Sequence, residues 1–442
     1  MTAATSSSSS SSSTTTPIAR DAAITAALLP IGAAYAGAPA DLLQRDGAFQ
    51  LSAKRSAGGG PAAAHSRPPG SRGQREPHPS VFNPATCVRK GHHTVPVHPK
   101  CTHKAPFQIY YEVHGRGPIR LVYSMGLATS CAGWLAQVEH FTSTSSKQST
   151  GTGTGTGTDT GSDNEDKYSC LVYDQRGFGS SQVPKGRYRT SDMAYDLLSL
   201  LNELQWTTDG QVEGRRQIHL VGVSMGGMVA LELARLAPSH IASLTLVSTT
   251  SGQSFGSKSP LVGLPPFKGI AAFTDVIVTS ILKTKTPAQH LEAMIDLLFP
   301  STWLDEAHPA DPAHRTRRVC LREMFIWRFQ YSRHSPPDGV LRQITAVATH
   351  GVGSAALAQI NADVPSITIV TGDEDHLVDP RNSEHLSRHL PRARLVRLKE
   401  SGHALPLQRA DELNRLIEQT ADLGRQRAQE SYWKDRTPRA VL

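Results

Sequence analysis

Short hydrophobic runs without polar alternation recur along the chain, and patterns typical of helices follow most of them. Such runs are predicted to be strands buried on both faces, as strands in the middle of a parallel sheet are. The predicted strands span residues 108–113, 119–124, 168–174, 218–223, 243–249, 366–372 and 393–398. Because strands and helices alternate, we expect an α/β fold in which helices flank a mostly parallel central sheet.

Helical periodicity is clearest from about residue 191 to residue 205, and further helices are predicted at 134–141 and directly after the 218–223 strand. Between residues 251 and 365 the alternation stops, and the sequence predicts only helices and loops. There, Thr286 and Gln289 flank a proline in a pattern typical of an N-terminal capping box. A helical insertion after one strand of a parallel sheet predicts a cap.

Two segments are strongly biased in composition. Residues 1–104 are rich in Ser, Thr, Ala, Gly and Pro, and residues 142–166 are rich in Thr, Ser and Gly. They predict a mostly disordered extension and a mobile loop, because neither composition can bury a core. The predicted organisation is an extension at 1–104, a first core part at 105–250, a helical cap at 251–365, and a second core part with a C-terminal helix and tail at 366–442.

Most of the net charge of +8 lies in the extension, because residues 1–104 contain eleven Lys and Arg residues but only four Asp and Glu residues. The remainder is nearly neutral, so nucleic-acid binding by the folded part is not expected. Residues 22–40 are uncharged but Ala-rich and contain Pro and Gly, so no stable membrane span is expected. The N-terminal extension is compatible with an organelle transit peptide or with a low-complexity segment that carries no targeting signal. We therefore expect a cytoplasmic or organellar protein and do not expect secretion.

The five cysteines are scattered and odd in number, which does not predict a disulfide framework. One cluster combines cysteine and histidine at spacings that match no familiar zinc site: Cys87, His92, His93, His98, Cys101 and His103. Glycine-rich phosphate loops and dinucleotide fingerprints are missing from the sequence. We therefore expect neither a metal nor a cofactor.

The 218–223 strand runs into a serine flanked by glycines, Gly222-Val223-Ser224-Met225-Gly226, and a helical pattern follows at once. This is either an ordinary strand-to-helix turn or a nucleophile held at a strained junction, and its context favours the nucleophile. Glycines two residues away on each side leave room for a sharp turn. The backbone N–H of Met225, at the start of the helix, is a candidate donor to an oxyanion.

A serine nucleophile needs a base, and the base needs an orienting acid. Carboxylates follow the 366–372 strand at Asp373, Asp375 and Asp379, and His403 follows the 393–398 strand. The carboxyl ends of parallel strands lie at one edge of a sheet, so these groups are expected on the same edge as Ser224.

These segments resemble the α/β-hydrolase fold superfamily, in particular serine hydrolases with a helical cap such as esterases and lipases. The resemblance runs from about residue 107 to residue 421 and rests on MGLATSCAGW, YDQRGFGSS, LVGVSMGGMVALELA, IVTGDEDHLVDP and SGHALP. It implies a triad of Ser224, Asp375 and His403, with the acid three residues after the glycine that ends its strand. It also implies Leu127 as the second backbone oxyanion donor, in a loop that lacks the histidine with which relatives usually begin it.

The resemblance implies a cofactor-independent hydrolase of a small molecule, most simply an apolar carboxylic ester cleaved through an acyl-enzyme on Ser224. Amide or carbon–carbon hydrolysis, cofactorless peroxidation and a non-catalytic ligand receptor on the same fold are the alternatives. Candidate pocket residues, each with ordinary packing as the alternative, are Trp303, Phe325, Trp327 and His350, with Gln343 as a further possible substrate contact. The oligomeric state stays open.

Overall fold

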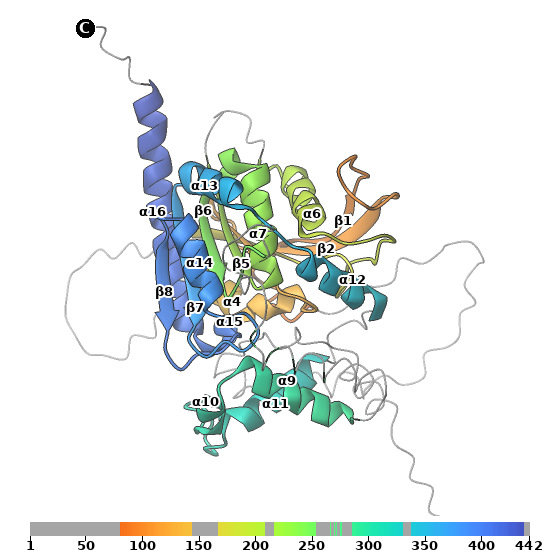
Figure 1. The fold of residues 1–442 in the computed structure, drawn as a ribbon. Helices are drawn as coiled ribbons and strands as arrows, with labels where there is room; N and C mark the ends of the chain where they lie inside the picture. The colour runs from red at the N-terminus through yellow and green to blue at the C-terminus, as the bar shows by residue number, and fades with distance from the viewer. Residues whose placement is uncertain are drawn as a thin grey trace, which may run out of the picture.

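The computed structural model describes residues 80–143, 167–207, 216–252, 285–329 and 337–436, together with the single positions 266, 269, 271 and 275. Its centre is an eight-stranded sheet with the strand order β1-β2-β4-β3-β5-β6-β7-β8 (Figure 1). The strands are β1 (Cys87–Val95), β2 (Phe107–His114), β3 (Ile119–Ser124), β4 (Tyr168–Tyr173), β5 (Ile218–Val223), β6 (Ile241–Val247), β7 (Ser366–Gly372) and β8 (Arg394–Leu398).

The strands from β3 to β8 run parallel, whereas β2 pairs antiparallel with both β1 and β4. The carboxyl ends of the parallel strands therefore share one edge, called the carboxyl edge below. The α/β class and the mostly parallel sheet predicted from the sequence are confirmed. The predicted strand at 243–249 begins two residues late, because β6 starts at Ile241 and ends at Val247.

Strand β1 corrects the predicted organisation, which assigned residues 1–104 to a mostly disordered extension. Residues 87–95 pair with β2 from Cys87↔His114 to Val95↔Phe107. The hydrophobic pattern missed this strand because it lies at the edge of the sheet and keeps polar side chains partly or fully exposed. The core therefore begins well before residue 105. Residues 1–79 and 144–166, most of the two segments predicted to be disordered or mobile, lie outside the described residues.

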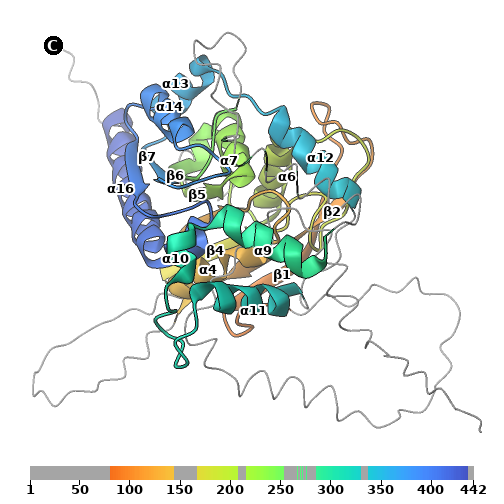
Figure 2. The ribbon, with the colours of Figure 1, turned by 60° about the horizontal axis from the view of Figure 1, so that its bottom comes forward.

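Helices cover both faces of the sheet (Figures 1 and 2). One face carries α6 (Thr190–Glu203), α7 (Met225–Leu236), α13 (Ser354–Asp363) and α14 (Arg381–His389); the other carries α4 (Leu135–Thr142) and α16 (Ala410–Arg436). Alternate residues of β5 serve the two layers: Leu220 packs in the α7 layer and Val221 in the α16 layer. This two-sided burial is the reason why the strand reads as continuously apolar.

The remaining named elements lie around these two layers. They are η1 (Cys131–Trp134), η2 (Pro238–His240), α9 (Pro287–Leu298), α10 (Ser301–Asp305), α11 (Arg317–Phe329), α12 (Pro337–Ala348) and α15 (Leu405–Gln408). Among the described helices, none is both long enough and apolar enough to cross a membrane.

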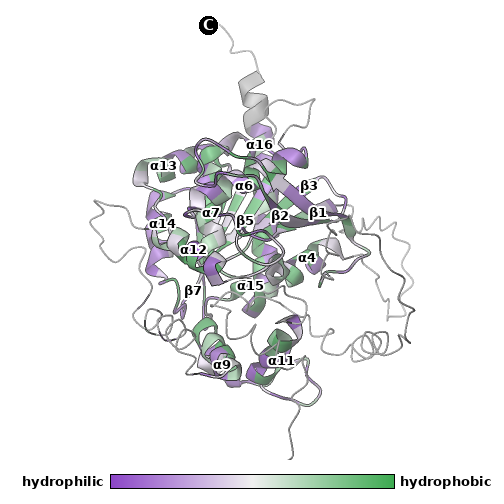
Figure 3. Cartoon of the chain, turned by 90° about the vertical axis from the view of Figure 1, so that its right-hand side faces the viewer, coloured by the Kyte–Doolittle hydropathy of each residue, from purple (hydrophilic) through white to green (hydrophobic). Residues whose placement is uncertain are grey.

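Helices α9, α10 and α11, called the inserted helices below, form a group beyond the carboxyl edge (Figure 1), and their buried residues join the hydrophobic cluster that contains α4 and α16. Hydrophobic and hydrophilic residues alternate along α9 and α11 (Figure 3). The capping box predicted at the start of α9 is confirmed, since the Thr286 hydroxyl accepts from the Gln289 N–H and the Gln289 side chain accepts from the Thr286 N–H. The predicted cap boundary at residue 365 is too late, because α13 packs on α7 in the layer that covers the sheet.

Candidate active site

Ser224 is the single residue between β5 and α7, and its backbone is strained, with φ 53° and ψ −124°. Its N–H donates to the carbonyl of Val247 at 2.9 Å, and its carbonyl accepts from the N–H of Gly227 at 2.9 Å. Residues other than glycine rarely adopt positive φ, and strain of this kind persists only where the surroundings fix it. Hydrogen bonds on both sides of Ser224 supply that constraint.

The glycines around Ser224 allow backbone segments to approach closely. A Cβ on Gly222 would lie 2.4 Å from the carbonyl oxygen of Gly226, and one on Gly226 would lie 2.0 Å from that of Ser124. The loop after β3 is packed against the serine, because a Cβ on Gly126 would lie 3.8 Å from Ser224 Oγ. The turn therefore sets Ser224 beside the loop that contains Leu127.

Asp375 and His403 form a buried pair, with 2.8 Å between Asp375 Oδ2 and His403 Nδ1. The other carboxylate oxygen of Asp375 accepts from the N–H groups of Leu377 at 2.9 Å and Val378 at 2.8 Å. These bonds fix the carboxylate, and the carboxylate fixes the imidazole so that Nε2 is the nitrogen turned away from Asp375.

The two neighbouring acids have other partners. Asp373 Oδ1 accepts from the Ser401 N–H at 3.2 Å. Asp379 bonds to the backbone N–H and the guanidinium of Arg381 at the start of α14, and these contacts hold the pKa of Asp379 below its usual range. Of the three carboxylates that the sequence offered, the structure therefore brings Asp375 to His403.

The inserted helices help to hold His403. The backbone N–H of His403 donates to the carbonyl of Leu298, the last residue of α9, at 2.9 Å. A Cβ on Gly402 would lie 2.3 Å from that same carbonyl oxygen, so glycine is needed for the approach. The sequence pattern did not predict this contact, because more than a hundred residues separate the two partners.

The turn after β4, Asp174-Gln175-Arg176-Gly177, is held by buried polar contacts. Buried Asp174 accepts from the N–H groups of Cys131 and Ser180, both at 2.7 Å, and burial raises its pKa. Arg176 is fully buried and bonds both oxygens of Asp196. Burial also raises the pKa of the Cys131 thiol, so this cysteine near the site is not a ready nucleophile.

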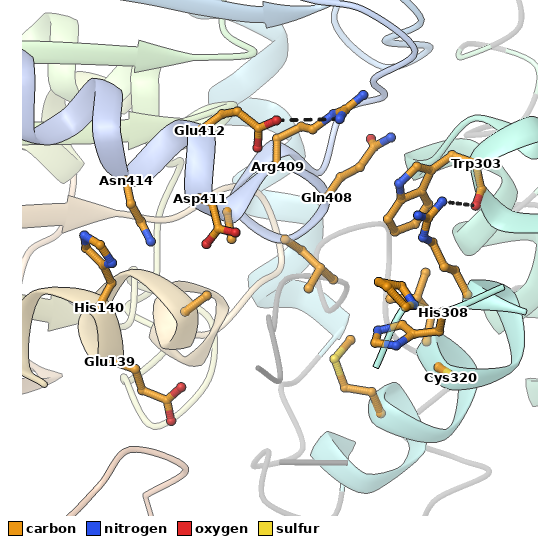
Figure 4. Close-up of a pocket in the computed structure, with 17 residues that line it drawn as sticks. Glu139, His140, Trp303, His308, Cys320, Gln408, Arg409, Asp411, Glu412 and Asn414 are labelled. Carbon is orange, nitrogen blue, oxygen red and sulfur yellow. Dashed lines mark hydrogen bonds and ion pairs between the residues drawn. The ribbon is translucent and has the colours of Figure 1, made fainter. Parts of the chain in front are cut away.

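Trp303 packs against the hydrophobic cluster that contains Phe325. A cavity of about 550 Å³ between the inserted helices and α4, α15 and α16 is lined by Trp303, but none of Ser224, Asp375 and His403 lines it. Figure 4 shows Trp303 and His308 on one side of this cavity and Asp411 on the other.

Trp303 is itself packed, since its ring stacks on Phe299 with 5.3 Å between centroids. Phe325 is fully buried in the core, and Trp327 is half-buried on α11. His350 lies just after α12, where its Nδ1 is 2.8 Å from the Thr190 hydroxyl. Burial lowers the pKa of His350 to about 4, so the ring is neutral at pH 7. Packing accounts for these contacts of Phe325 and His350.

Among the described residues, the side chains that lie close enough to hold a metal ion together are not the cluster noted in the sequence. Cys87, Glu112 and His114 place one ligand atom each within 4.8 Å of one another. Glu112 Oε1 already accepts from the hydroxyls of Ser80 and Tyr110, both at 2.8 Å, and His114 Nε2 lies 3.3 Å from Oε2. Burial opposes ionisation of Glu112, but these hydrogen bonds outweigh it and lower the pKa. Hydrogen bonds from Ser80 and Tyr110 thus account for the placement of the Glu112 carboxylate.

The chain is similar to known hydrolases over most of its folded length. The sequence model of the Alpha/beta hydrolase family matches residues 154–416. RutD of Stutzerimonas stutzeri, a provisionally assigned carbamate hydrolase, is 27% identical over 322 residues, which are 70% of this chain and 95% of that protein. RutD of Pseudomonas syringae, with the same provisional assignment, is 31% identical over 254 residues, 55% of this chain and 82% of that protein.

Solved structures share the fold. An esterase from Thermogutta terrifontis superposes with a TM-score of 0.51 at 23% identity, over 75% of this chain and 97% of the esterase. A bromoperoxidase from Bacillus anthracis gives a TM-score of 0.54 at 20% identity, over 76% of this chain and 100% of the other. The family model matches more than half of the chain, and the parallel sheet and the serine at the strand-to-helix junction agree with that match. The chain belongs to the alpha/beta hydrolase family.

Proposed function

We propose that the chain is a cofactor-independent serine hydrolase that cleaves a carboxylic ester through an acyl-enzyme on Ser224. The observation that carries the proposal is the buried Asp375–His403 pair at 2.8 Å, on the same sheet edge as a serine at a strained strand-to-helix junction. A base that is oriented by a buried acid activates a serine hydroxyl that is otherwise a weak nucleophile.

In the proposed reaction, Ser224 Oγ attacks the carbonyl carbon while its proton passes to His403 Nε2. The oxyanion accepts hydrogen bonds from the backbone N–H groups of Leu127 and Met225. Collapse breaks the bond to the alcohol, which leaves with the proton from His403. Water then attacks the acyl-enzyme, with His403 as base again, and releases the carboxylic acid and free Ser224.

A carbamate is the second candidate substrate class, because the RutD relatives carry that provisional assignment. Esters and carbamates both present a carbonyl with an oxygen leaving group, so the same residues can act on either. Nitrophenyl esters and nitrophenyl carbamates of matched size distinguish the two classes through their kcat/KM ratio.

The first test is labelling by a fluorophosphonate probe together with turnover of nitrophenyl esters of increasing acyl length. We expect wild type to label and turn over, and Ser224→Ala to do neither. Asp375→Asn should lower kcat by about 10⁴-fold, whereas the matched variant Asp379→Asn, which alters an acid without contact to His403, should stay near wild type. A folded wild type that neither labels nor hydrolyses esters or carbamates contradicts the proposal and favours a ligand receptor.

A further inference from the structure

The loop after β3 carries Leu127, the proposed oxyanion donor, and its next peptide unit is held at both ends. The N–H of Ala128 donates to Gln343 Oε1 at 2.8 Å. The carbonyl of Leu127, in the same peptide unit, accepts from the Thr129 hydroxyl at 3.1 Å. Ala128 has φ 48°, which an alanine adopts only at a cost, so these two bonds stabilise an unfavourable turn.

Gln343 comes from α12, more than two hundred residues along the chain. Its Nε2 donates to the carbonyl of Arg176 at 2.8 Å while its Oε1 accepts from Ala128. The orientation of the amide follows from its partners, because a backbone N–H only donates and a carbonyl only accepts. The side chain is fully buried, so water does not compete for either bond. Gln343 thus joins the loop after β3 to the turn after β4.

Helix α12, which carries Gln343, is held against the turn after β4 by a close backbone contact. A Cβ on Gly339, in its first turn, would lie 2.1 Å from the carbonyl oxygen of Gly177, so the two backbones are in direct contact. Ala128, Phe178 and Val340 form a small buried cluster beside the same loop. The amide of Gln343 is therefore held by a fixed frame, as a precise positioning group must be.

We propose that Gln343 is a positioning residue that fixes the Leu127–Ala128 peptide. By fixing this peptide, it holds the neighbouring Leu127 N–H at hydrogen-bonding distance from the oxyanion of the Ser224 adduct. This inference rests on the proposed function. It accounts for how a loop without the usual histidine is braced, since the thioether of Met125 is at best a weak acceptor and donates no hydrogen bond. Gln343 contacts the loop and not the substrate.

The test compares the kinetics of Gln343→Met, which keeps the side-chain length but makes neither bond, with wild type on one nitrophenyl ester. A displacement of about 1 Å in a catalytic group can cost about a hundredfold in rate. We expect kcat to fall by about ten- to a hundredfold while KM changes less than about threefold. Binding of a trifluoromethyl ketone, which forms an oxyanion adduct with serine, should weaken by the same factor as kcat.

Three further variants separate positioning from general destabilisation. Gln343→Glu can make both bonds only as the neutral acid, because an ionised carboxylate would face the Arg176 carbonyl in a buried position; it should therefore lower kcat as Gln343→Met does. Thr129→Val removes the bond at the other end of the peptide and should lower kcat in the same way, which keeps the test decisive if Gln343→Met does not fold. Thr345→Ala, at an exposed position of α12 whose hydroxyl bonds only within the helix, is the matched control and should match wild type.

If the wild-type protein turns over ester and both Gln343→Met and Thr129→Val keep the wild-type kcat, this inference is overturned while the proposed function stands. So does a fall in kcat that is not matched by weaker ketone binding. A wild type that neither labels with fluorophosphonate nor turns over ester overturns the proposed function, and this inference with it.

Discussion

Ser224 adopts a backbone conformation that a serine tolerates poorly, with φ 53° and ψ −124°. Strain of this kind costs on the order of 1–3 kcal/mol and is found where function requires a particular geometry. Here the strained turn joins the end of β5 directly to the first residue of α7, Met225. Under the proposed function, this strain is the cost of holding the nucleophile at the turn.

The strain at Ser224 predicts a difference between two inactive variants. Ser224→Gly should be more stable than Ser224→Ala by about 1 kcal/mol, because glycine accepts this conformation and the relief exceeds its larger unfolded-state entropy. Urea unfolding of both proteins measures the difference. At Ser387, inside α14, the order should reverse, since alanine is the better helix former there. Equal stability of the two Ser224 variants would contradict the strain argument.

Gly226 is a second residue whose identity the turn dictates. In Gly226→Ala the new methyl would lie 2.0 Å from the backbone oxygen of Ser124, which cannot move without shifting β3. We expect a loss of about 3 kcal/mol in the free energy of unfolding, at the upper end of overpacking effects. Gly353→Ala is the control, because no atom lies within 4 Å of its added Cβ. Chemical denaturation that finds the two variants equally stable would refute this reading.

At the scale of single elements, β5 joins the core and the site. Its side chains enter both helical layers, and its last residue leads directly into Ser224. The strand also carries a buried polar group, His219, whose Nδ1 is 2.9 Å from the hydroxyl of Ser243 on β6. Burial lowers the pKa of His219 to about 3, so the folded protein holds this ring neutral.

His219 predicts a pH dependence of stability. Between pH 6.5 and about 3 the unfolded chain binds a proton at this ring that the folded chain does not, so stability falls as the pH falls. The contribution is up to about 1.4 kcal/mol per pH unit. His219→Leu should flatten the slope of unfolding free energy against pH from 6.5 to 4.5 by about one proton. Leu220→Ala should lower stability and keep the slope; an unchanged slope in His219→Leu would count against the assignment.

At the scale of the whole molecule, sheet order brings distant segments to one edge. Ser224, Asp375 and His403 follow β5, β7 and β8, and the inserted helices between β6 and β7 supply the carbonyl that holds the His403 backbone. The opposite end of the strand order is closed by β1, which covers β2.

The place of β1 predicts different outcomes for two truncations. Deletion of residues 1–75 should leave the melting temperature and the proposed esterase activity close to those of the full chain, because Ser80, β1 and their contacts with β2 remain. Deletion of 1–104 removes β1 and exposes the pairing edge of β2, so we expect a lower melting temperature and aggregation. Thermal unfolding and size-exclusion chromatography measure both; equal behaviour of the two proteins would show that β1 is dispensable.

Seven of the eight strands and the serine junction were predictable from the sequence, because continuous apolar runs and the Gly-x-Ser-x-Gly turn leave local signals. Strand β8 is a partly exposed edge strand, but its sequence, RLVRL, keeps an apolar pattern. Residues 87–95 left no such signal, because charged and polar side chains separate the few apolar residues of this edge strand. The choice of Asp375 among three acids came from the resemblance, and local sequence alone did not distinguish them. The pocket residues stay a prediction, because aromatic side chains on helices pack into cores and line cavities with the same periodicity.

The sequence by itself determined the α/β class and predicted the strand-to-helix turn around Ser224, because both depend on residues that are neighbours along the chain. Only the tertiary structure decided which acid contacts His403, that the carbonyl of Leu298 holds the His403 backbone, and that Gln343 braces the loop beside Ser224. Those contacts join residues from 28 to 215 positions apart. Their partners are chosen by how strands and helices pack, and no local pattern records that choice.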